Sequence, residues 1–181
     1  MKQHAFCGWW QRLRANRRGI AALEFAVVAP TIIVALLGGY QLLDAVTVFR
    51  KLTDTTVQLA NITAQYTTMS QSDVTTVLDA STTIMEPYST APISIVLSEI
   101  TTDANGNATV TWSKALQGTA LSAGSTVTMP PGFDNPSTSY ILVQSNYAYT
   151  PTVGAAFIGP IPMTKQVVML PRASASIPFT G

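Results

Sequence analysis

The chain has 181 residues, of which 47% are hydrophobic and only 10% are charged. An average soluble domain carries about 25% charged residues, so this composition excludes an ordinary soluble surface and indicates membrane association or an exported domain rich in Thr and Ser. The net charge of +1 hides an asymmetry, because residues 1–18 contain no acid, whereas from Ile20 onward nine acids outweigh five basic residues.

The N-terminal head is basic and short, and it precedes a long apolar run. Its five basic residues are Lys2, Arg12, Arg14, Arg17 and Arg18. Such a head is typical of the cytoplasmic side of a membrane segment. A nucleic-acid-binding arm is the alternative, but these residues abut an apolar run rather than a folded basic surface. We therefore expect residues 1–19 to be a cytoplasmic leader, in which Cys7, the only cysteine, is incidental.

A membrane helix is predicted directly after the leader. The nineteen residues Phe25–Leu43 carry no charge. They span roughly 28 Å as a helix, close to the ~30 Å of a bilayer core, and we place the transmembrane segment at 20–48. A cleaved signal peptide is the alternative, with Gly38-Gly39 as its small-residue site, although the length of the run and the intramembrane Glu24 weigh against it.

Two features are expected to shape this helix. Pro30 removes one backbone hydrogen bond and should bend the helix. Gly38 and Gly39 offer small residues where another helix could approach closely. Apolar residues continue at three-to-four spacing beyond the membrane segment, which predicts one long helix over 18–67 that packs an apolar face on the exported part.

The rest of the chain predicts an α+β domain. Ser72-Asp73 looks like the cap of a second helix that Pro87 ends, so residues 49–90 should be an extramembrane helical part. Residues 91–181 are rich in Val, Ile, Thr and Tyr and should form a four-stranded antiparallel β domain. The expected strands are Ile93–Thr101, Asn107–Lys114, Tyr140–Thr150 and Thr164–Leu170, with a hairpin at Asn105-Gly106 and irregular loops at 115–139 and 151–162.

The N-terminal stretch resembles the signature of a known family. Basic residues are followed by Gly19 and then by an apolar run with Glu24 five positions later, in the order Arg18-Gly19-x-x-Ala22-x-Glu24-Phe25-Ala26-x-Val28-Ala29-Pro30. This pattern is similar to type IV prepilins and, more narrowly, to the TadE-like proteins of tight-adherence (Flp-type) pili. The tail is similar too, through Tyr147-x-Tyr149-x-Pro151, Phe157-Ile158-Gly159-Pro160-Ile161-Pro162 and Met169-Leu170-Pro171-Arg172. Phe25 stands where the major Flp pilin usually has Tyr, which favours a minor, pseudopilin-type member.

The resemblance implies a processing step and a docking residue. A prepilin peptidase would cut between Gly19 and Ile20, and glycine leaves room for a protease at the backbone. The resemblance assigns subunit docking to Glu24, with Phe25 beside it. A carboxylate in lipid needs a partner or a proton, and the new Ile20 amine is the nearest candidate. The alternative is that Glu24 merely sits among the lipid headgroups.

Catalytic and metal-binding patterns are missing from the sequence. The only histidine, His4, lies in the leader, so we expect no enzyme activity, no metal site, no cofactor and no small-molecule substrate. Asp103-x-Asn105-x-Asn107 faintly resembles a calcium loop, but a hairpin turn is favoured. We expect five scattered acids to be solvated, and Tyr147 and Tyr149 to share one face of a strand. The acids are Asp73, Asp79, Glu86, Glu99 and Asp134.

The sequence therefore predicts a single-pass protein of a bacterial inner membrane, with its N-terminus cytoplasmic and its C-terminal domain periplasmic or extracellular. The resemblance implies a prepilin peptidase, other pilin-like subunits and the pilus assembly platform as partners, and no nucleic acid is expected. The alternative is an uncleaved, membrane-anchored or secreted surface protein that acts in adhesion. Enzymatic activity is a distant third.

Overall fold

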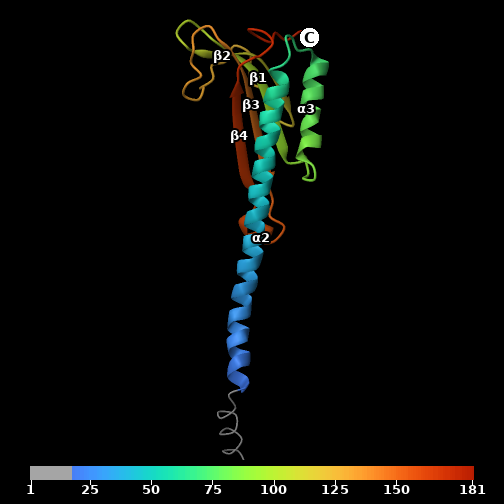
Figure 1. Ribbon diagram of the computed structural model, residues 1–181, viewed down its shortest axis with the longest axis vertical. Coiled ribbons are helices and arrows are strands. Elements are labelled where there is room, and N and C mark those ends of the chain that lie inside the picture. Colours follow the sequence, from blue (N-terminus) through green and yellow to red (C-terminus); the bar gives the residue numbers. More distant parts are fainter. Residues whose placement is uncertain (1–17) are drawn as a thin grey trace, which may run out of the picture. The chain divides into compact units, whose positions relative to one another are not determined.

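The computed structural model describes residues 18–181, so the predictions for the leader, including Cys7, Arg12, Arg14 and Arg17, lie outside it. The chain divides into two compact units, with the boundary between Leu43 and Asp44. Helix α2 (Arg18–Thr63) contributes to both units, and every other element described within residues 18–181 belongs to the second (Figure 1). These elements are α3 (Gln71–Met85), β1 (Ile93–Thr102), β2 (Ala108–Leu116), β3 (Ser139–Tyr149), α4 (Ala155–Ile158) and β4 (Ile161–Met169).

The prediction of one long N-terminal helix is confirmed, although α2 ends at Thr63 rather than near residue 67. The chain tightens there, because Gln65 N–H bonds to the carbonyl of Ile62, three residues back, at 3.1 Å. The carbonyl of Ala64 instead accepts a hydrogen bond from Arg172 N–H at 2.8 Å, which ties the helix end to the C-terminal part of the chain. Orphan carbonyls at a helix end need such partners.

The second helix begins earlier than the sequence suggested. The predicted cap at Ser72-Asp73 is wrong: Ser70 is the N-cap, and Asp73 is the third residue of the helix. Ser70 Oγ accepts from Asp73 N–H, while Asp73 Oδ2 accepts from Ser70 N–H at 2.9 Å, so the two residues form a reciprocal capping box. The hydrogen bonds from the Ser70 side chain and backbone lower the pKa of Asp73. As predicted, α3 ends just before Pro87.

The predicted four-stranded antiparallel sheet is confirmed, with the order β2-β1-β3-β4. Strand β4 begins at Ile161, three residues before the predicted start, because the ladder with β3 extends to the pair Tyr149 and Ile161. Pro162 fits inside β4 because this strand lies at the edge of the sheet, where a missing N–H costs no ladder bond. The short helix α4 lies in the stretch that was expected to be an irregular loop.

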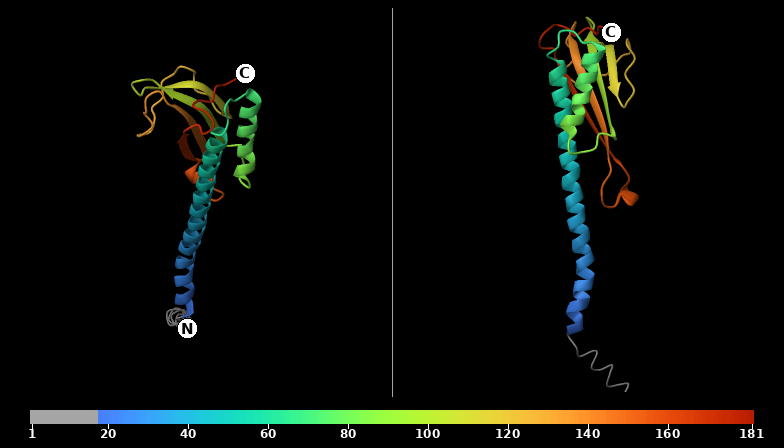
Figure 2. Two further views of the ribbon diagram at one scale, coloured as in Figure 1. Left: turned by 45° about the horizontal axis from the view of Figure 1, so that its top comes forward. Right: turned by 90° about the vertical axis from the view of Figure 1, so that its right-hand side faces the viewer.

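Helices cover one face of the sheet. Figure 2 shows α3 and the C-terminal part of α2 on the same side of the strands. Leu52 and Leu59 of α2 are at most 1% exposed and belong to one core with Val74 of α3 and with Ile95 and Val143 of the sheet. Complete burial of a leucine contributes about 1.5–3 kcal/mol. The expected packing of the projecting half of α2 on the β domain is therefore confirmed for residues 44–63.

The other face of the sheet carries a second, smaller core. It is covered by the irregular loop 117–138, which contributes Leu121, Val127, Met129 and Phe133. The ring of Phe133 packs edge-on against Tyr140 of β3, with 5.7 Å between the ring centres. The long loop is thus a structural cover for the sheet.

Position 106, in the β1–β2 turn, requires glycine for two reasons: the backbone conformation and the space beside it. Its φ is +82°, and a Cβ atom there would lie 2.7 Å from the carbonyl oxygen of Asp134. Gly124, at φ +80°, is the matched control, because a Cβ atom added there would meet nothing within 4 Å. Replacing Gly124 with alanine should cost about 1–2 kcal/mol for the left-handed backbone alone.

We expect Gly106→Ala to lower the free energy of unfolding by at least about 1 kcal/mol more than Gly124→Ala, since the clash adds to the strain. Urea denaturation of the full chain in detergent measures both variants. Equal losses would show that the loop around Asp134 moves away freely.

Candidate functional site

The described part of the first unit presents a largely apolar surface, with Glu24 as its one charged side chain between Gly19 and Leu43. Helix α2 is long and apolar enough to cross a membrane once, by length and composition, and its most apolar stretch is not buried within the structure. Phe25 is 74% exposed and Leu43 is 70% exposed. A signal sequence near an N-terminus meets the same criteria. Large exposed apolar surface of this kind requires a membrane or a protein partner.

The predicted processing and docking residues lie in the first two turns of α2. Gly19 is the second residue of the helix, and a Cβ atom added to it would meet nothing within 4 Å. Ile20, Glu24 and Phe25 are all exposed. Ile20 and Glu24 are four residues apart on a helix, and this spacing places them one above the other on the same face.

The residues predicted to bend and pack this helix are Pro30, Gly38 and Gly39. Pro30 lies inside α2, and the helix continues on both sides of it. Gly38 and Gly39 are exposed, and a Cβ atom added to either would meet nothing within 4 Å. The helix surface at the two glycines is open, as the close approach of a second helix would need.

Glu99 is not solvated, contrary to the prediction. Its side chain is 1% exposed, and its neighbours across the ladders, Trp112 and Ile141, belong to the core under the helices. Glu99 Oε1 accepts hydrogen bonds from Ser139 Oγ at 3.1 Å and from Ile177 N–H at 2.7 Å. Among the described residues, Glu99 Oε2 has no hydrogen-bond partner. Glu99 is buried because alternate residues of β1 face the core, and the apolar residues that precede it at a spacing of two lie on the same face. This alternation is visible in the sequence.

The bonds of Glu99 hold the C-terminal segment, residues 173–181, across the end of the core. Trp112 Nε1 donates to Ile177 O at 2.7 Å, and Met69 N–H donates to Pro178 O at 3.0 Å. The ring of Phe179 lies 5.9 Å from that of Trp112 and is covered by Lys114 Nζ at 4.3 Å. The segment therefore closes the domain through backbone bonds and a buried carboxylate.

A hollow with polar and apolar lining lies where the second unit begins. It is lined by Asp44 and Val48 of α2, by the turn around Tyr88 and Ser89, and by the end of β3. Tyr149 Oη donates to Asp44 Oδ2 at 2.7 Å, and Tyr147 Oη donates to the carbonyl of Ser89 at 3.1 Å. The prediction that Tyr147 and Tyr149 share a face is confirmed, and both rings join the core.

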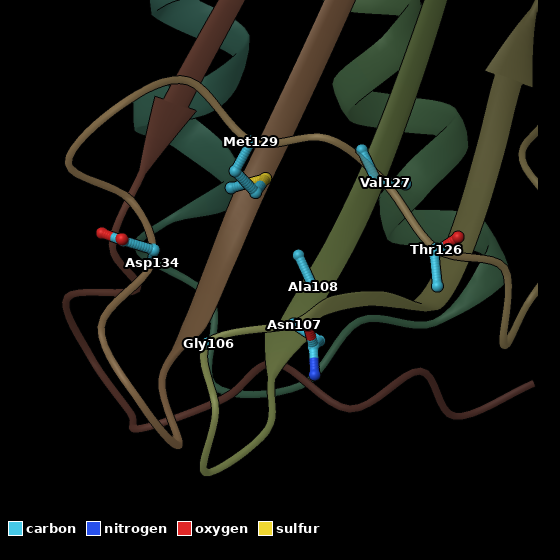
Figure 3. A pocket seen from close by; sticks show the side chains of 7 residues that line it. All are labelled: Gly106, Asn107, Ala108, Thr126, Val127, Met129 and Asp134. Atoms are coloured by element: carbon cyan, nitrogen blue, oxygen red, sulfur yellow. The ribbon is translucent and has the colours of Figure 1, made fainter.

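A second pocket lies beside the hairpin turn (Figure 3). Its lining comes from the β1–β2 turn, the start of β2 and the loop 117–138, and the carboxylate of Asp134 points away from the other labelled side chains. The neighbouring Asp103 is committed to the turn, because its Oδ1 accepts from the backbone N–H groups of Asn105 and Asn107. The hydrogen bonds from Asn107 lower the pKa of Asp103. The hairpin prediction is thus confirmed, and this pocket brings no set of charged groups together.

Among residues 18–181, no three His, Cys, Asp or Glu side chains gather in a way that could hold a metal ion. Comparison of the chain with protein-family models, with curated proteins and with solved structures finds no match.

Proposed function

We propose that the protein is a minor, pseudopilin-type component of a tight-adherence pilus system, of the TadE-like kind. In this role it is anchored in the bacterial inner membrane by α2, with the leader in the cytoplasm and the α+β domain outside. It acts by packing its helix against pilin-like partners on the assembly platform. The action is structural and needs no cofactor.

One observation carries this proposal. A carboxylate, Glu24, interrupts an otherwise apolar and exposed helix surface five residues after Gly19. An ionisable residue in a membrane segment is costly and is by default a functional candidate. Cleavage after Gly19 would create an amine at Ile20, one turn from Glu24, that could pair with this carboxylate in the same chain or in a neighbouring subunit. The charge asymmetry of the chain supports the proposed orientation.

The runner-up function is an uncleaved anchored or secreted surface domain that acts in adhesion. The exposed apolar helix fits both functions, because either protein needs a membrane segment. An anchor alone, however, gives no role to the carboxylate of Glu24. The two functions differ in where the mature protein is found.

Mechanical shearing of pili from cells tests the proposal. We expect the protein in the sheared fraction together with other pilin-like subunits. Its exclusive retention in washed membranes would favour the anchored adhesion protein, and its presence only in the culture medium would favour a secreted one. Cells that lack the prepilin peptidase are the control, because the sheared fraction should lose the protein there.

A further inference from the structure

The hollow at the start of the second unit is a cavity of about 330 Å³. Liquid water occupies about 30 Å³ per molecule, so a group of several non-hydrogen atoms fits inside. Asp44 is the only charged residue among the nine that line the cavity, and three of the others are tyrosines. All nine lie within residues 44–150, in the second unit.

Two of the three phenolic groups of the cavity, those of Tyr147 and Tyr149, have already committed their hydrogens. Tyr149 donates to the Asp44 carboxylate, and Tyr147 donates to the carbonyl of Ser89. Each hydroxyl has one hydrogen, so neither of these two phenols has a further proton to donate. Carboxylate and carbonyl oxygens are acceptors as well. These groups therefore favour a ligand that donates several hydrogen bonds.

The negative charge of Asp44 also favours a ligand that carries hydrogen-bond donors. The pKa of Tyr147 is raised, first by burial and then by the negative charge of Asp44 and by Tyr88. Burial disfavours any charge in the cavity, whereas the Asp44 carboxylate opposes a second anion and favours a cation. Tyrosine rings add to the preference where a cation lies over their faces.

We propose that this cavity binds an organic ammonium group, such as ethanolammonium. Its N–H groups would donate to the Asp44 carboxylate and to the phenolic oxygen of Tyr149. Such a group can come from a lipid headgroup or from a soluble amine. The lipid source rests on the proposed membrane anchoring, because Asp44 is the first charged residue after the uncharged run Phe25–Leu43. The preference for ammonium does not depend on it.

The first arm of the test uses the full chain in a maltoside detergent, which carries no ammonium. Ethanolammonium chloride is titrated while NMR follows the resonances of Ala148 and Tyr149, with ethylene glycol as the neutral analogue and sodium chloride as the ionic-strength control. We expect saturable shifts with ethanolammonium alone. Asp44→Asn should weaken binding by about tenfold or more, since a hydrogen bond to a charged group is lost. Asp54→Asn, exposed on the same helix, should bind like the parent chain.

The second variant, Tyr149→Phe, removes both the phenolic acceptor and the hydroxyl that positions the Asp44 carboxylate, and it should weaken binding severalfold. It keeps the test decisive if Asp44→Asn fails to fold, because a Tyr149→Phe chain that binds like the parent chain would then overturn the proposal. Shifts that are equal for ethylene glycol, or a folded Asp44→Asn that binds like the parent chain, would overturn the proposal.

The second arm identifies the source. Native mass spectrometry compares retention of phosphatidylethanolamine and phosphatidylglycerol by the full chain and by Asp44→Asn. Preferential, Asp44-dependent retention of phosphatidylethanolamine supports the cavity as a headgroup site. Equal retention of the two lipids, together with binding of free ethanolammonium, supports the cavity with a soluble amine as its ligand.

Discussion

Replacing Glu24 with alanine is expected to leave the protein in the membrane but to remove it from pili. Insertion depends on the apolar run Phe25–Leu43, which the change leaves intact. Docking, in contrast, would lose the partner of the Ile20 amine. An unpaired charge in lipid costs several kcal/mol, and each ~1.4 kcal/mol changes an association constant by a factor of ten. We therefore expect the amount in the sheared fraction to fall about tenfold or more.

A second variant of Glu24 separates charge from size, and a change at Thr31 is the control. Glu24→Gln keeps the length of the side chain and should be as defective as Glu24→Ala, because an amide does not form an ion pair. Thr31→Ala removes an exposed hydroxyl that bonds weakly to the carbonyl of Val27 in the same segment, and should assemble normally. Quantitative immunoblots of membrane and sheared fractions measure all three variants. Normal piliation by Glu24→Ala would refute the docking role.

Replacing Glu99 with alanine should be among the most damaging changes to the folded domain. It leaves the N–H of Ile177 and the hydroxyl of Ser139 without their buried acceptor and opens a cavity under the C-terminal segment. Each buried group left unpaired costs about 1–3 kcal/mol. Part of this loss is offset, because the change also removes Glu99 Oε2, which is buried without a hydrogen-bond partner. We expect the free energy of unfolding to fall by about 2–4 kcal/mol.

Urea denaturation of the full chain in detergent measures this loss, and hydrogen exchange locates it. The amides of Ile177 and Thr180 should exchange faster in Glu99→Ala, because the C-terminal segment is freed first. Asp79→Ala is the control, since Asp79 is exposed on α3, and it should stay within about 0.5 kcal/mol of the parent chain. A comparably small change in Glu99→Ala would contradict the role of the carboxylate in closing the domain.

Much of the architecture could be predicted from periodicity and turn residues. The long helix, the second helix, the hairpin around Gly106 and the four strands follow from spacings of 3.6 and 2 and from local turn chemistry. These signals are local, so a single chain shows them. The N-cap was misplaced at Ser72 because Ser70 and Ser72 are equally good capping residues, and only the reciprocal bonds with Asp73 decide between them.

The missed features depend on contacts between distant parts of the chain. Glu99 was expected in solvent because its charge outweighed the alternation of β1, whereas Ile177, far along the sequence, supplies the N–H that stabilises its burial. The hollow at Asp44 likewise combines α2 with residues about a hundred positions later. No short-range pattern encodes such pairs. Gly19 and Glu24 are the opposite case, because their proposed roles rest on a linear motif.

The mass of the mature N-terminus tests the central claim, that residues 17–30 form a prepilin-type signal, most directly. The protein is extracted from the membranes of cells with an active prepilin peptidase, and its N-terminal peptide is sequenced by mass spectrometry. The account predicts a chain that begins at Ile20, with the basic leader removed. A chain that begins at Met1 in those cells would contradict it.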